Sequence, residues 1–326
     1  MQEKRPGSVF NRIGLSLLLM LLLPQVVGTL WGILVGMMSF AFPDGLAKVA
    51  QSGFVVMLVS YFSLYCVAFP LSILICGNLP AYRSDVPGKK PGFVAMLRFL
   101  VFGIAATFAI NLLFTLFMMV SFGTDGNLVS QFVTSFEPWE VFLLTVIVAP
   151  IMEEIVFRRF LYKKLAMYGK KTYMLVSALA FAVFHLNIGQ AMYAFILGLI
   201  FAWIMYTTGK VIYPIILHML VNCLGGFIPS LILEGQTVII IIYSLAVYGI
   251  IFAGLVWFIV DLVRHGKKCL SSIVTKEPGA PKWRTVFLNP GMILYFSIGL
   301  IIMGIIFLTT ILMSIFPEVF TSVLPG

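Results

Sequence analysis

Six polar residues stand in segments of the chain that are otherwise almost entirely apolar. They are Glu153, Glu154, Arg158, His185, His218 and Asn222, and they include two of the three histidines of the sequence. A charge near the middle of a membrane helix costs roughly 2.5–3.5 kcal/mol on insertion scales, so it is retained where it has a partner or a task. The set therefore predicts an active site inside a membrane.

The two adjacent glutamates are expected to have different tasks. Glu154 and Arg158 are four residues apart with the acid first, which favours an ion pair on one helix face. Glu153 points about 100° away from Glu154 on the same helix. We expect Glu154 to hold Arg158 and Glu153 to remain free as a general base. Pro150, one turn before Glu153, removes a backbone hydrogen bond and favours a kink or cavity there.

A second helix is expected to face this one. His218 and Asn222 are four residues apart, so both point into one cavity, and Pro214 precedes His218 by four residues as Pro150 precedes the glutamates. We expect Pro214 to distort its helix in the same way.

Two kinds of hydrolysis fit a carboxylate, two imidazoles and an amide without serine or cysteine. In one, Glu153 activates a water that His185 also holds, while His218 and Asn222 donate hydrogen bonds to the oxyanion. In the other, Glu153, His185 and His218 bind a divalent metal such as zinc, which lowers the pKa of its water. The cofactor is therefore either such a metal or none. The sequence lacks the H-E-x-x-H and G-x-S-x-G motifs.

The composition is that of a membrane protein. Of 326 residues, 61% are hydrophobic and only 10% charged, whereas soluble domains have about 25% charged residues. We expect an all-α polytopic protein with about nine transmembrane helices of roughly 17 residues or more. They are predicted near residues 13–40, 53–77, 97–122, 139–162, 173–188, 190–208, 211–232, 237–260 and 290–316.

Basic residues indicate the topology. With the N-terminus in the cytoplasm, every Lys and Arg except Lys48 falls on the cytoplasmic side of these spans, and an odd number of spans places the C-terminus outside. The net charge of +9 then reflects a collar facing anionic membrane lipids and requires no nucleic-acid partner. Compact loops and the lack of organelle-targeting signals predict a bacterial cytoplasmic membrane. Gly28, Gly32 and Gly36 form a small-residue stripe that predicts close helix packing.

Three motifs in order resemble those of the CPBP family. They are Glu-Glu-x-x-x-Arg at 153–158, Phe-x-x-x-His from Phe181 to His185, and His-x-x-x-Asn from His218 to Asn222. The family includes CAAX prenyl proteases of the Ras-converting-enzyme type and bacterial bacteriocin-processing or Abi proteins. The resemblance covers about residues 145–227.

The resemblance implies an intramembrane endopeptidase, open to the cytoplasmic side, that cleaves a membrane-associated or lipidated peptide or protein. It makes Glu153 the catalytic glutamate, His185 its partner at the water, and His218 with Asn222 the oxyanion donors. Glu154 and Arg158 become supporting members, and metal dependence stays open.

The chain divides by sequence into three regions. Residues 1–137 are predicted to form an N-terminal three-helix region, 138–232 a catalytic core of four transmembrane helices, and 233–326 a C-terminal two-helix region. Two other functions remain: a non-proteolytic family member acting as a membrane scaffold or binding protein, and a proton-coupled transporter. The intact motif set favours the peptidase, because a scaffold has no need of each catalytic group.

Overall fold

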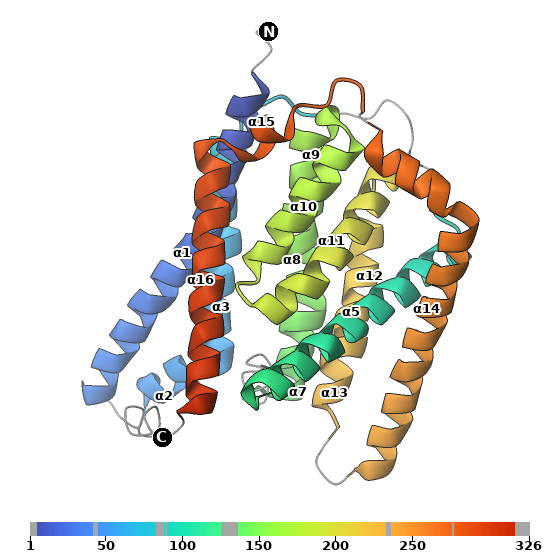
Figure 1. The fold of residues 1–326 in the computed structure, drawn as a ribbon. Helices are drawn as coiled ribbons and strands as arrows, with labels where there is room; N and C mark the ends of the chain where they lie inside the picture. Colours follow the sequence, from blue (N-terminus) through green and yellow to red (C-terminus); the bar gives the residue numbers. More distant parts are fainter. Residues whose placement is uncertain are drawn as a thin grey trace.

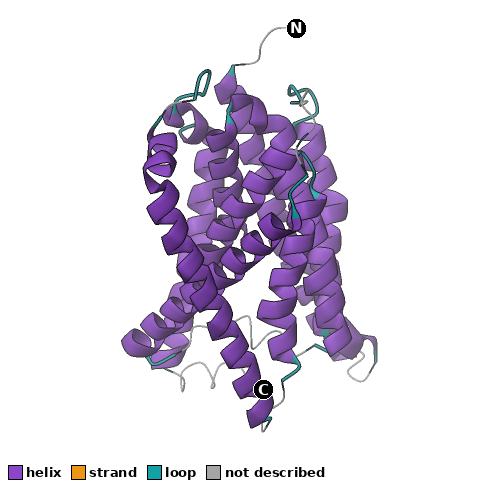
Figure 2. Ribbon diagram, turned by 90° about the vertical axis from the view of Figure 1, so that its right-hand side faces the viewer, coloured by secondary structure: helices purple, strands orange, loops and turns teal. Residues whose placement is uncertain are grey.

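The computed structural model describes residues 5–41, 45–82, 88, 90–124, 136–232, 236–275 and 277–316. Within these ranges every regular element is a helix, and the long helices lie side by side in a bundle (Figures 1 and 2). Apolar side chains cover most of the exposed surface of helices such as α14 (Thr237–Val274) and α5 (Phe93–Phe122). These features confirm an all-α polytopic membrane protein.

Within the described ranges, seven helical segments are long and apolar enough to cross a membrane. They are Pro6–Ala41, Gly53–Ile75, Phe93–Phe122, Ile188–Thr208, Ile212–Ser230, Thr237–Lys267 and Pro290–Ile315. The other two predicted spans are helical but differ in kind. One is a run of consecutive helical pieces from Pro138 to Leu165, and the other, α10 (Lys170–Phe184), has only 15 residues. The count of nine spans and the orientation of the termini therefore stay predictions.

Helices from both ends of the chain surround a central hairpin. The hairpin consists of α10 and α11 (Ile188–Thr208), with α12 (Ile212–Asn222) beside it. Helices α1 (Pro6–Ala41) and α16 (Pro290–Ile315) pack together on one flank, and α5 and α14 pack together on the other (Figure 1). Contacts thus cross the three predicted regions, whose division stays a prediction.

The run that carries the glutamates is built from short pieces. It comprises α7 (Pro138–Val141), the π-helical η2 (Phe142–Val148), α8 (Ala149–Glu153), the π-helical η3 (Glu154–Phe160) and α9 (Leu161–Leu165). The remaining elements are α2 (Leu46–Gln51), α3 (Gly53–Tyr61), η1 (Phe62–Ala68), α4 (Phe69–Ile75), η4 (Ala166–Tyr168), η5 (Cys223–Phe227), α13 (Ile228–Ser230) and α15 (Trp283–Phe287).

Close packing of glycines occurs, but not at the stripe where the sequence predicts it. A Cβ on Gly14 would lie 2.2 Å from the backbone of Gly291, so these two glycines bring α1 and α16 into contact. For Gly28, Gly32 and Gly36, no heavy atom of the described residues lies within 4 Å of a Cβ position. The prediction for that stripe is therefore wrong within the described part of the chain.

Basic side chains gather at one end of the bundle, which we call the basic end. It is formed by the starts of α1, α10, α12 and α16 and the ends of α9, α11 and α14, at the top of Figure 1. It carries, among others, Arg12, Lys163, Lys171, Lys210 and Arg284. Lys48 lies on α2, which is at the opposite end of the bundle. Helix α7 lies at that end too. Lys4, Arg83, Lys89 and Lys276 lie outside the described residues.

Candidate active site

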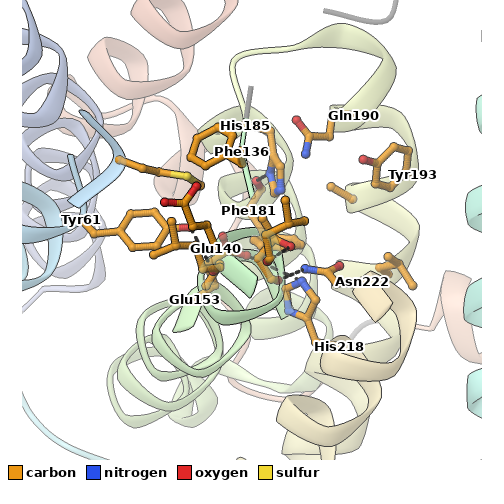
Figure 3. Close-up of a pocket in the computed structure, with 17 residues that line it drawn as sticks. Tyr61, Phe136, Glu140, Glu153, Phe181, His185, Gln190, Tyr193, His218 and Asn222 are labelled. Atoms are coloured by element: carbon orange, nitrogen blue, oxygen red, sulfur yellow. Dashed lines mark hydrogen bonds and ion pairs between the residues drawn. The ribbon is translucent and has the colours of Figure 1, made fainter. Parts of the chain in front are cut away.

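Four of the six residues singled out in the sequence line one cavity of about 260 Å³ (Figure 3). Glu153 ends α8, His185 follows α10, and His218 and Asn222 come from α12. The three helical segments that carry the motifs therefore meet at this cavity, and α3 and α11 also line it. Glu154 and Arg158 are fully buried behind it and do not line it.

The predicted ion pair is present. Arg158 Nε lies 3.0 Å from Glu154 Oε2, and neither side chain is exposed. The guanidinium lies over the ring of Phe181 at 4.2 Å from its centroid and near that of Phe201 at 5.4 Å. Aromatic faces attract a cation, most strongly where water is excluded. The charge of Arg158 is thus balanced by one carboxylate and two rings.

Glu154 has a second contact that the sequence reasoning missed. Its Oε1 lies 2.9 Å from Nδ1 of His218, which is 64 residues away on α12. With the carboxylate ionised, Nδ1 carries the proton and donates it in this hydrogen bond. His218 Nε2 is then directed to the cavity, 3.7 Å from Glu153 Oε2 (Figure 3). Glu154 therefore joins Arg158 and His218 and fixes the orientation of the imidazole.

His185 is oriented by its own helix. Its Nδ1 lies 2.7 Å from the carbonyl oxygen of Phe181, four residues earlier. A carbonyl only accepts, so Nδ1 is the donor and Nε2 is left available. The Phe181 ring also meets the His185 ring edge-on at 4.7 Å. The Phe-x-x-x-His spacing in the sequence was a signal for this pair.

Asn222 is held by the opposite helical run. Its Nδ2 donates to the carbonyl oxygen of Thr145 at 2.8 Å. An amide nitrogen has two N–H groups, so one remains for another acceptor. Thr145 was not identified from the sequence, because its side chain bonds Val141 within its own helix and only its backbone contacts Asn222.

The two prolines behave differently. Pro150 follows the π-helical segment η2, whose residues Leu144 and Thr145 line the cavity, so the expected irregularity is present beside Glu153. Pro214 lies in the first turn of α12, where a backbone N–H has no partner within the helix anyway. The prediction of a distortion at Pro214 is therefore wrong.

The cavity extends away from the basic end. From Glu153 its wall continues along the same helical run to Glu140 and Phe136, at the α7 end of the bundle (Figures 1 and 3). On the other side of Glu153, Phe157 and Arg158 are less than 2% exposed. The expectation that the site opens toward the basic, cytoplasmic end is therefore not confirmed.

The geometry does not assemble the alternative metal site. Among the described residues, no three His, Cys, Asp or Glu side chains come together as a group that could hold a metal ion. This includes Glu153, His185 and His218, the metal ligands considered from the sequence.

A known protein family has a model that matches this part of the chain. Residues 135–224 match the family model described as type II CAAX prenyl endopeptidase, Rce1-like. The matched region contains all six residues of the candidate site and its surrounding helices α7 to α12. No curated protein and no solved structure matches the chain.

Proposed function

We propose, from the premise that residues 135–224 form an Rce1-like domain, that the protein is an intramembrane endopeptidase. The observation that carries this proposal is the convergence of Glu153, His185, His218 and Asn222 on one cavity within an apolar bundle. Its substrate is a membrane-associated peptide or protein, and the nucleophile is a water.

Glu153 begins the reaction as a general base. A water held between its carboxylate and Nε2 of His185 loses a proton to Glu153 and attacks the scissile carbonyl carbon. The carbonyl π bond opens and leaves a negative charge on its oxygen. Glu153 then gives the proton to the amide nitrogen, the C–N bond breaks, and the products are a carboxylic acid and an amine.

His218 and Asn222 stabilise the oxyanion. Asn222 contributes its free N–H, and His218 contributes Nε2–H in its protonated form. Glu154 stabilises that cation through the 2.9 Å contact with Nδ1.

The substrate is expected to enter from the α7 end. Phe136, Val141 and Leu144 give the wall an apolar character between Glu153 and the α7 end, where we place the mouth of the cavity. Hydrogen-bonding groups of a peptide lose water on entering such a site, so the entering segment should carry mostly apolar side chains. If the basic end is cytoplasmic, this mouth faces the other side of the membrane.

A peptide library tests the proposal. Purified protein in detergent is incubated with membrane-anchored peptides, and the products are identified by mass spectrometry. We expect cleavage by the wild type and by Glu137→Gln, an exposed control with the same chemical change, but not by Glu153→Gln. Equal cleavage by Glu153→Gln would overturn the assignment. Tight peptide binding by a folded wild type without any cleavage would favour the scaffold function.

A further inference from the structure

A second cavity, of about 490 Å³, lies near the basic end of the bundle. It shares no lining residue with the candidate active site. Its walls come from Lys90 and Pro91, the start of α5, the first residue of α10 and the last two turns of α11. Because α11 contributes its first half to the active site, the two cavities lie toward opposite ends of this helix.

The polar side of this cavity is positively charged. It is lined by Lys90, which is exposed, and Lys170, which is half-buried, and none of its described lining residues is Asp or Glu. The nearby carboxylate of Glu277 interacts with Lys170, but it also accepts from the backbone N–H of Lys171 at 3.2 Å. One carboxylate near Lys170 is thus set against the two lysines that line the cavity, and the net charge of these groups remains positive.

The other side is aromatic. The Phe99 and Trp203 rings lie 5.0 Å apart, and Tyr206 adds a third ring. Lys170 Nζ lies 5.1 Å from the centre of the Trp203 ring, which keeps the ammonium at the edge of the apolar wall. Trp and Tyr are typical of the boundary between lipid headgroups and acyl chains. The cavity therefore combines cations with an apolar wall, the two surfaces that an anionic lipid would contact.

The start of α5 adds to the positive potential of this cavity. Its N-cap residue Gly92 gives no side-chain cap, and Ala95 in the first turn lines the cavity. The first backbone N–H groups of a helix have no partner within it and carry a partial positive charge, which attracts anions such as phosphate.

We propose that this cavity binds the phosphate headgroup of an anionic phospholipid, with Lys90 and Lys170 at the phosphate and an acyl chain along Phe99, Trp203 and Tyr206. Basic pockets between helices at the cytoplasmic face are suited to such headgroups. A soluble phosphate would use the lysines but not the aromatic wall, which is why a lipid is favoured.

Thermal unfolding in detergent tests the site, because a ligand that binds only the folded state raises Tm. Three additives are compared: phosphatidylglycerol, phosphatidylcholine with the same acyl chains, and inorganic phosphate. They are added to the wild type, to Lys90→Gln/Lys170→Gln, and to Lys282→Gln/Arg284→Gln, which removes two exposed charges elsewhere at the same end. If the double variant does not fold, the single variant Lys90→Gln takes its place.

We expect phosphatidylglycerol to raise Tm in the wild type and in the Lys282/Arg284 control, and the Lys90/Lys170 variant to lose more than half of that shift. Phosphatidylcholine should give a clearly smaller shift. An undiminished shift in the Lys90/Lys170 variant would overturn the proposal. So would an equal shift with phosphatidylcholine, while an equal shift with inorganic phosphate would make this a site for soluble anions.

Discussion

At the scale of single residues, the buried group of Glu154, Arg158 and His218 is the feature that distinguishes this site from a simple ion pair. Glu154 contacts Arg158 through one oxygen and His218 through the other. Removal of one member of a buried charged set is strongly destabilising, because it leaves an uncompensated charge. Glu154 should therefore matter for both folding and turnover, whereas Glu153 should matter for turnover.

Glu154→Ala should lower the free energy of unfolding by about 3–5 kcal/mol and reduce activity. Thermal unfolding in detergent and peptide cleavage measure the two effects. The double variant Glu154→Ala/Arg158→Met removes both charges of the pair and should regain part of the lost stability, but not the activity, because His218 still lacks its partner. A stable, fully active Glu154→Ala protein would show that the buried carboxylate has neither role.

His218→Ala and Asn222→Ala should lower kcat more than they raise KM, since their hydrogen bonds form with the oxyanion of the transition state. Loss of one oxyanion donor costs roughly 100–1000-fold in kcat. Steady-state kinetics on a peptide found in the library separates the two constants. An increase of KM with unchanged kcat would instead assign these residues to substrate binding.

Turnover should survive thorough chelation. In the proposed mechanism Glu153 and His185 hold the water without an ion. The assay is cleavage after dialysis against a chelator, with metal content measured in parallel. Stoichiometric zinc that is lost together with activity, and restored with it, would favour the metal alternative.

At the scale of helices, the motifs are predictable because i, i+4 spacing decides which side chains share a face. The Glu154–Arg158 pair and the shared cavity of His218 and Asn222 follow from this rule. Contacts between different helices do not follow from this rule. Glu154 with His218, and Asn222 with Thr145, depend on how the helices are rotated and displaced against each other. Pro214 does not distort its helix as predicted, because α12 begins only two residues before it.

Helix contacts also separate two classes of glycine. Gly14→Ala should lower Tm, because its Cβ would meet the backbone of Gly291 and force α1 from α16. Gly32→Ala, in the same helix but facing open space, should leave Tm unchanged or raise it slightly, since alanine favours a helix over glycine by about 1 kcal/mol. Equal losses of Tm in both variants would show that α1 and α16 are not held by this contact.

At the scale of the whole molecule, the distribution of basic residues and the direction of the active-site cavity are two separate features. The composition was sufficient to predict a helical membrane protein, and basic residues do lie on the helix ends at one end of the bundle. The cavity of the candidate site extends to the other end. Sequence patterns could not reveal this direction, because it depends on which aromatic side chains fill the space around Arg158.

Topology can be measured with single cysteines in a background without the native ones. Cysteine in place of Lys210 should react with a membrane-impermeant reagent only from the cytoplasmic side, and cysteine in place of Lys48 only from outside. Both positions are exposed and lie at opposite ends of the bundle. Labelling of both from the same side would contradict the predicted arrangement of spans.

Cleavage in ¹⁸O-enriched water tests whether Glu153 activates a water for peptide hydrolysis. The new C-terminal carboxyl group of the product is examined by mass spectrometry for the wild type and for Glu153→Gln of equal Tm. We expect one ¹⁸O atom per product for the wild type and a loss of at least about 100-fold in product for the variant. Labelled product formed by Glu153→Gln at the wild-type rate would contradict this role of Glu153.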